Sequence, residues 1–212
     1  MTPRFAAAVD PVFRQALVLL DRIQRGDSLD PQEQQQRLLA LLEQGSLVAG
    51  SSEEWNLAQY ALVSWLDEML VDTPWNGQDW WSNNVLEWSL YQSRNCHERF
   101  YLLANQAAES VRRDALNVFH DCVVLGFRGL YRNSNRVADL TRRQGLPPTI
   151  TDWLRQAQLS IRIGEGRRPL ASAQRTVHGA RPLTSSVRAI WAWTAAAVLL
   201  AANVAIYRML MA

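Results

Sequence analysis

The chain has 212 residues, of which 48% are hydrophobic, and its net charge is +2. That charge is unevenly divided, because residues 1–161 carry 15 arginines and 19 acidic residues, whereas residues 162–212 carry seven arginines and one acidic residue. The acidic N-terminal part argues against nucleic acid as the main partner, and the two cysteines exclude a disulfide framework.

The N-terminal part of the chain reads as a series of helices. An aspartate followed by proline begins the first two, because proline is favoured at the first helical position, and glycine ends both. Ser51 and Glu54 have the spacing of a capping box and begin a third helix, which Thr73-Pro74 ends. These signals predict helices over residues 10–26, 30–45 and 51–72.

A tryptophan-rich loop containing Trp75, Trp80 and Trp81 follows the third helix, and we favour core packing over a docking surface for these rings. No segment alternates apolar and polar residues in the manner of a half-buried strand. The fold class is therefore predicted to be all-α, with residues 1–163 forming one helical domain. The later helices are expected over residues 84–91, 97–110, 113–130, 136–144 and 151–163.

Three acidic residues, Asp67, Glu68 and Asp72, lie in the last turns of the third predicted helix. Negative charge at a helix C-terminus opposes the macrodipole and costs about 0.3–1 kcal/mol for each unpaired group. Something must therefore offset these charges. Either an arginine of a neighbouring helix does so, with Arg128 and Arg132 as the candidates, or the basic surface of a partner protein does.

No catalytic, metal or cofactor site is predicted. The three histidines and two cysteines lack the spacing of a metal site, and no nucleophile motif or phosphate-binding loop is present. Gly126 and Gly129 form a GxxG pattern, which we interpret as a close helix approach or a helix end. A hydrolase that uses Glu68 and Asp72 with a divalent metal remains a rival hypothesis.

The C-terminal part of the chain is predicted to anchor it in a membrane. Residues 189–207 carry no charge over nineteen positions, and a helix of that length spans about 28 Å, close to the thickness of a bilayer core. We expect a basic linker at 164–187, a transmembrane helix at 188–208 and a short periplasmic tail at 209–212. The arginines before the helix place the N-terminal head in the cytoplasm.

One side of the predicted anchor carries small residues, Ala197, Ala201 and Ala205, at intervals of four. Small side chains allow transmembrane helices to pack closely, and Asn203 would seek a polar partner within the membrane. The anchor is therefore expected to associate with other membrane helices, including copies of itself.

Two segments resemble the TssL/DotU (IcmH) family. LAQYALVSWLDE at residues 57–68, followed by DTPW at 72–75, is similar to the family's YALxxxLDE…TPW helix end. LNVFHDCVVLGFRGLYR at 116–132 is similar to its LxxxYxCLxLGFxGxYR helix, and carries the motif residues Gly126, Phe127, Gly129, Tyr131 and Arg132. The chain departs from the family between these motifs, because the glycines of a Gly-Gly-Glu stretch are missing.

The resemblance implies a cytoplasmic head of two small helix bundles that form a hook with a cleft. It implies a structural, non-enzymatic subunit of the inner-membrane complex of the type VI secretion system, or of the related type IVB system, in a short form without a peptidoglycan-binding extension. The implied partners are an IcmF/TssM-like membrane protein and baseplate components. Asp67 and Glu68 match an acidic pair in the cleft region, so the resemblance favours partner contact there, with Asp72 and Trp75 beside them.

A tail-anchored regulatory or sequestering protein is the alternative function, since the anchor and the acidic head fit it equally well. Changing Asp67 and Glu68 to lysine is expected to weaken baseplate recruitment with little loss of helicity. Unfolding of the head would instead identify these acids as structural partners of arginines.

Overall fold

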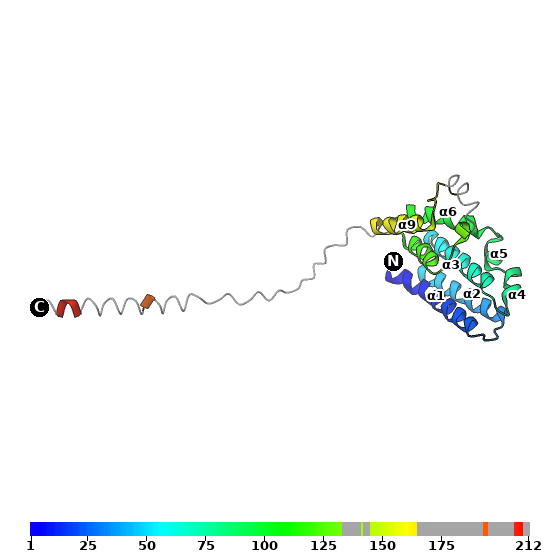
Figure 1. Cartoon of the computed structure of the whole chain (residues 1–212), viewed down its shortest axis with the longest axis horizontal. Helices are drawn as coiled ribbons and strands as arrows, with labels where there is room; N and C mark the ends of the chain where they lie inside the picture. Colours follow the sequence, from blue (N-terminus) through cyan, green and yellow to red (C-terminus); the bar gives the residue numbers. More distant parts are fainter. Residues whose placement is uncertain (133–140, 142–144, 165–192, 195–205, 210–212) are drawn as a thin grey trace. The chain divides into compact units, whose positions relative to one another are not determined.

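The computed structural model describes residues 1–132, 141, 145–164, 193–194 and 206–209. Residues 1–168 form one compact unit, which we call the head (Figure 1). Its described elements are all helical, which confirms the all-α prediction: α1 (Pro3–Gln24), α2 (Pro31–Ala49), α3 (Glu53–Asp72), α4 (Gln78–Asn83), α5 (Leu86–Tyr91), α6 (Cys96–Glu109), α7 (Asp114–Val124), η1 (Gly129–Arg132) and α9 (Ile150–Gly164).

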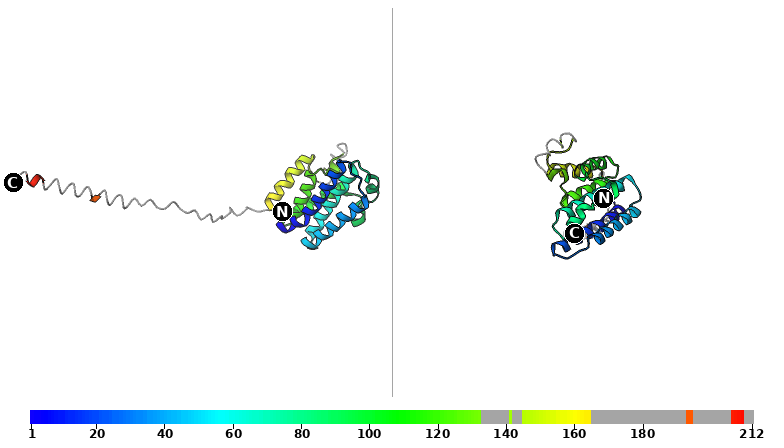
Figure 2. Two further views of the ribbon diagram at one scale, coloured as in Figure 1. Left: turned by 90° about the horizontal axis from the view of Figure 1, so that it is seen from below. Right: turned by 90° about the vertical axis from the view of Figure 1, so that its right-hand side faces the viewer.

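Helix α3 is the central element of the head, because 13 of its 20 residues are buried. The antiparallel pair α1 and α2 covers one side of it, with Arg4 near the start of α1 donating to the Val48 carbonyl near the end of α2. Helices α6 and α7 pack on another side, with α9 packed on α7 and α6, and α4 and α5 cover its C-terminal half (Figures 1 and 2). Side chains from all these groups join one continuous hydrophobic core. The division into two bundles that form a hook stays a prediction.

The first two helices extend beyond their predicted ends. Helix α1 begins at Pro3, and Pro11 lies inside it, although an internal proline removes one backbone hydrogen bond. Burial of Phe5, Ala8 and Val9 holds the first turns in place and outweighs that loss. The sequence signal at Asp10-Pro11 was therefore wrong about the start of the helix.

Gly45 does not end α2, which continues to Ala49. A Cβ atom at Gly45 would lie 2.4 Å from the ring of Trp55 and 2.9 Å from the Ala8 carbonyl oxygen. The glycine therefore serves the close packing of α2 against α1 and α3. At the start of α3, the capping side chain is Ser52, which accepts from the Trp55 amide, and not Ser51.

Helix α7 ends at Val124, six residues earlier than predicted, and the GxxG pattern is the reason. Gly126 has φ +119°, a conformation that other residues rarely adopt, and Gly129 has φ +48°. The helix-end interpretation of these glycines is confirmed. The prediction of a tryptophan-rich loop was partly wrong, because Gln78–Asn83 forms helix α4, and the helix predicted at 84–91 is shortened to α5. The helix predicted at 136–144 lies, apart from Thr141, outside the described residues.

The tryptophans after α3 pack together, as favoured from the sequence. Trp81 is fully buried, and its ring lies 6.3 Å from the rings of both Trp75 and Trp80. These contacts hold α4 against α3, which positions the site described below.

In the part of the chain that the structure describes, no helix is both long enough and apolar enough to cross a membrane. Most of the predicted anchor at 188–208 and the linker at 164–187 lies outside the described residues, as do all four predicted packing residues, Ala197, Ala201, Asn203 and Ala205.

Candidate functional site

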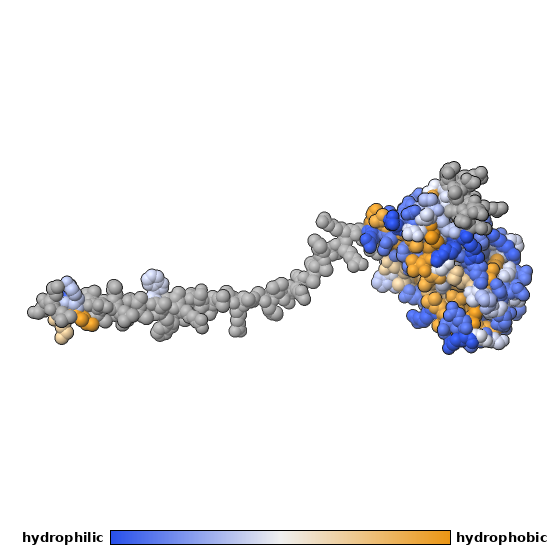
Figure 3. Space-filling view, in the orientation of Figure 1, coloured by the Kyte–Doolittle hydropathy of each residue, from blue (hydrophilic) through white to orange (hydrophobic). Residues whose placement is uncertain are grey.

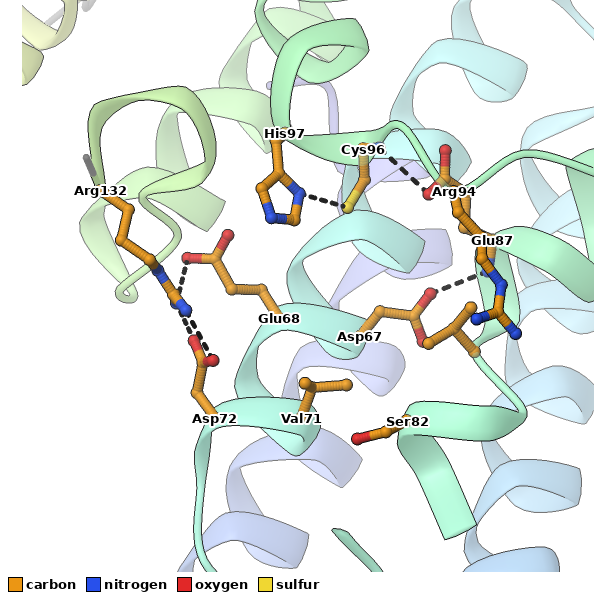
Figure 4. Close-up of a pocket in the computed structure, with 11 residues that line it drawn as sticks. Asp67, Glu68, Val71, Asp72, Ser82, Glu87, Arg94, Cys96, His97 and Arg132 are labelled. Carbon is orange, nitrogen blue, oxygen red and sulfur yellow. Dashed lines mark hydrogen bonds and ion pairs between the residues drawn. The ribbon is translucent and has the colours of Figure 1, made fainter. Parts of the chain in front are cut away.

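A cavity of about 210 Å³ opens beside the C-terminal half of α3 (Figure 4). Its walls come from α3, from the α4–α5 segment, from the first residues of α6 and from the end of η1. Charged side chains dominate its polar lining: Asp67, Glu68, Asp72, Glu87, Arg94 and Arg132. The site therefore brings together all three acidic residues identified in the sequence.

Asp67 binds the start of α5 from across the cavity. Its side chain accepts hydrogen bonds from the amides of Leu86 (2.9 Å) and Glu87 (2.8 Å) and from the indole of Trp81 (3.0 Å). The residue before α5 is Val85, which has no side chain able to cap a helix. Asp67, only 3% exposed, supplies the missing cap from a different helix.

Glu87 repeats this arrangement one helix further along the chain. It is 2% exposed and accepts from the amides of Asn95 (3.2 Å) and Cys96 (3.1 Å), at the start of α6, and from the Tyr60 hydroxyl (2.7 Å). Asn95 itself makes no capping hydrogen bond with its side chain. Sequence reasoning missed Glu87, because nothing in its local pattern distinguishes it from an ordinary acidic residue in the first turn of a helix.

Glu68 binds the segment that follows α7. It accepts from the amides of Arg128 (2.7 Å) and Gly129 (2.9 Å), and its Oε1 lies 3.2 Å from Nη2 of Arg132. The guanidinium of Arg132 also pairs with Asp72 (Figure 4). Of the two arginines considered from the sequence, Arg132 pairs with the acidic residues, whereas the Arg128 guanidinium donates to backbone carbonyls.

Internal contacts therefore occupy the oxygens of Asp67 and Glu68. The exposed residues of the cavity lining are Asp72, Arg94, His97 and Arg132. The Arg132 side chain is 47% exposed and the Asp72 side chain 34% exposed. A lysine at position 67 or 68 would remove buried acceptors, so reversing both charges tests folding and not only recruitment.

Trp75, predicted to contact a partner, is partly buried, and its indole donates to the Leu70 carbonyl (2.9 Å). It packs on Trp81 and is not among the residues that line the cavity. It supports the base of the site through α4.

The motif residues after α7 fix the wall that Glu68 binds. Phe127 is fully buried and stacks on Phe100 with ring centroids 4.0 Å apart. The Tyr131 hydroxyl donates to the Pro147 carbonyl (2.7 Å). A Cβ at Gly129 would lie 2.7 Å from the Phe127 ring and 3.0 Å from the His97 carbonyl oxygen, so the chain at this turn closely approaches α6.

Burial and neighbouring charge set the state of the titratable groups that line the cavity. Burial and the neighbouring carboxylates of Glu87, Asp67 and Glu68 raise the pKa of the Cys96 thiol well above its ordinary value, so the thiol stays protonated. Among the described residues, no three His, Cys, Asp or Glu side chains are placed to hold a metal ion. Glu68 and Asp72, the residues of the hydrolase hypothesis, share one arginine.

Burial raises the pKa of Asp67 to about 6 from an ordinary value of 3.8, although the hydrogen bonds from Glu87, Leu86 and Trp81 lower it. Between about pH 4 and pH 6 the Asp67 carboxyl is therefore mostly protonated in the folded state and mostly ionised in the unfolded state. The stability that this group contributes is therefore fully present below about pH 4 and falls by roughly 3 kcal/mol as the pH rises to about 6.

This pKa predicts that the native chain loses stability relative to the Asp67→Asn variant as the pH rises across that window. Urea unfolding of both proteins, measured at several pH values between about 4 and 7, checks this. A difference in unfolding free energy that does not change with pH would contradict the raised pKa of Asp67.

Two comparisons relate this chain to known proteins. A family model described as "Type VI secretion system protein DotU" matches residues 4–211. The solved cytoplasmic domain of TssL from Acinetobacter baumannii has a similar fold, with a TM-score of 0.57 and 23% sequence identity, over 76% of this chain and 98% of that chain. No curated protein matches the sequence.

Proposed function

Because the chain belongs to the DotU family of type VI secretion system proteins, we propose that it is a structural subunit of the inner-membrane complex of that system. The family assignment from the motifs at 57–75 and 116–132 is confirmed, and the family is structural and not enzymatic. The observation that carries the proposal is the length of the match, residues 4–211, which includes both the helical head and the apolar segment after it.

In this proposal residues 188–208 anchor the chain in the inner membrane, with the head in the cytoplasm and residues 209–212 in the periplasm. The uncharged run at 189–207 and the six arginines between residues 162 and 188 support this orientation. The small residues and Asn203 of the anchor contact an IcmF/TssM-like membrane protein and further copies of the chain.

The head recruits baseplate components through the cavity beside α3. Asp72, Arg94 and Arg132 present charge at its surface, where a partner can reach them. Asp67 and Glu68 contribute by holding the walls of the cavity in position, and Trp75 supports its base. A type IVB subunit or a tail-anchored regulator is the alternative, but the family description names the type VI system.

Capture of the full chain from solubilised membranes tests this function. We expect an IcmF/TssM-like protein and baseplate components to co-purify with it, and deletion of residues 189–207 to abolish capture of the membrane partner. The double variant Asp72→Ala/Arg94→Ala should weaken baseplate capture about tenfold, which corresponds to a combined loss of about 1.4 kcal/mol from two exposed interface residues.

The matched control is Asp21→Ala/Arg25→Ala, which removes an exposed acid–arginine pair from the end of α1. It should leave capture unchanged. A chain that purifies alone, in cells whose secretion survives its deletion, would contradict the proposed function. Equal losses in the two double variants would contradict the role of the cavity.

A further inference from the structure

One end of the head, where α6 and α9 both finish, exposes apolar side chains beside arginines. Val111, Ile163 and Leu159 are 93%, 73% and 55% exposed, and Arg112 and Arg162 are exposed among them. We call these five residues the α9 edge. Figure 3 shows hydrophobic and strongly hydrophilic atoms side by side where α9 ends.

The α9 edge is one fixed surface. Leu159 and Ile163 are four residues apart and therefore share a face of α9. Arg113 joins the α6–α7 loop to this helix, because its guanidinium donates to the Ser160 carbonyl and its Cδ would lie 2.5 Å from a Cβ at Gly164. Val111 and Arg112 line a hollow together with Gly164.

The arginines of the α9 edge also differ from several other exposed arginines of the head, although Arg14 on α1 is likewise exposed without an ion pair to a described residue. Arg22, Arg25 and Arg37 each pair with a carboxylate on their own helix or just after it. Arg112 and Arg162 make no ion pair or hydrogen bond with another described residue. Glu109, at the end of α6, is an exposed acid next to the edge. Because it offsets only one of the two arginine charges, the edge keeps a net positive charge.

We propose that the α9 edge lies on the anionic lipid surface of the membrane that anchors the chain, an inference that rests on the anchor of the proposed function. Apolar side chains of such a surface enter the boundary between headgroups and acyl chains, while arginines pair with lipid phosphates. The sequence after α9 favours lipid as the occupant, because residues 165–188 carry five arginines and one acid before the uncharged run begins.

The tether alone does not fix this contact. The 25 residue-to-residue steps from Gly164 to Ala189 span at most about 85 Å, a reach that keeps the head near the bilayer but does not by itself specify which side of the head faces it. In this proposal the α9 edge, which lies where the chain leaves the head, orients the head relative to the bilayer.

This orientation turns the cavity away from the membrane. Helix α6 begins with Cys96 and His97, which line the cavity, and ends just before Val111. Its 14 residues separate the two sites by about 21 Å. In Figures 1 and 2 the end of α9 and the α4–α5 segment lie at opposite ends of the head. The lipid contact thus leaves the cavity open to partners in the cytoplasm.

An environment-sensitive fluorophore on the full chain tests the contact. Ile163→Cys carries the probe, and Leu90→Cys, on α5 and 42% exposed, is the control position. The native Cys96 and Cys122 are buried, and the unsubstituted chain measures any label that reaches them. In vesicles of phosphatidylcholine with phosphatidylglycerol, the probe at position 163 should shift to the blue and be quenched by spin-labelled lipid, whereas the probe at position 90 should report water.

Arg112→Gln/Arg162→Gln, in the chain labelled at position 163, should lower the ratio of lipid-bound to free heads about thirty-fold, since each arginine near an anionic surface contributes about fivefold. Arg22→Gln/Arg25→Gln removes the same charge from the end of α1 and should change little.

A probe at position 163 that reports water on anionic vesicles, in a chain that floats with them, would overturn the lipid contact and leave the anchor intact. Shielding of that probe only after a cytoplasmic extract is added would assign the edge to a protein partner and overturn the inference. A chain that does not float with vesicles at all would overturn the anchor, and this inference with it.

Discussion

Replacing Asp67 with alanine is expected to lower the free energy of unfolding of the head by about 3 kcal/mol or more at neutral pH. The carboxylate accepts three hydrogen bonds, from the Leu86 and Glu87 amides and the Trp81 indole, and all three are buried. Alanine leaves these donors without an acceptor, and each buried unsatisfied group costs about 1–3 kcal/mol. It also removes the only side-chain cap of α5 seen in the described residues.

Urea unfolding of residues 1–168, followed by tryptophan fluorescence, measures this effect. Asp10→Ala is the control, because Asp10 is exposed in the middle of α1 and its loss should change stability by less than about 0.5 kcal/mol. If the two alanine variants were equally stable, Asp67 would not be holding α5, and a direct role in partner contact would regain support.

The order of most of the helices, and the ends of some, could be read from the sequence, because the signals that start and stop a helix are local. The stop of α3 at Thr73-Pro74 and the span of α9 follow from residues within one or two turns of each end. The signals failed where packing between distant segments decides the outcome. Gly45 is the residue type that often ends a helix, but it lies inside α2, where its missing side chain leaves room for the ring of Trp55.

The site was only half predictable for a related reason. The unfavourable charge of Asp67, Glu68 and Asp72 at the end of a helix could be recognised, and the pairing with Arg132 was one of the two answers considered. The larger part of the compensation comes from backbone amides. Those donors lie 19 to 61 residues away along the chain. Because nearly every residue has a backbone amide, the sequence does not indicate which amides the carboxylates bind.

Glu68→Ala is the second substitution with a large expected effect, of about 3 kcal/mol on the stability of the head. It removes the acceptor of the Arg128 and Gly129 amides and leaves Arg132 with Asp72 alone. The turn after α7 would then lose its backbone hydrogen bonds to α3. Asp72→Ala is the matched control, since it removes only a partly exposed ion pair, whose contribution is about 1 kcal/mol or less.

Hydrogen exchange separates this mechanism from a general loss of stability. In Glu68→Ala the amides of Arg128 and Gly129 should exchange faster than those in the middle of α3, whereas Asp72→Ala should leave their protection close to native. A double-mutant cycle with Arg132→Ala then isolates the ion pair, and we expect its coupling to be smaller than the whole effect because two of the three contacts of Glu68 are to the backbone. A coupling that accounts for the entire loss would show that charge pairing, and not capping of the turn, is what Glu68 contributes.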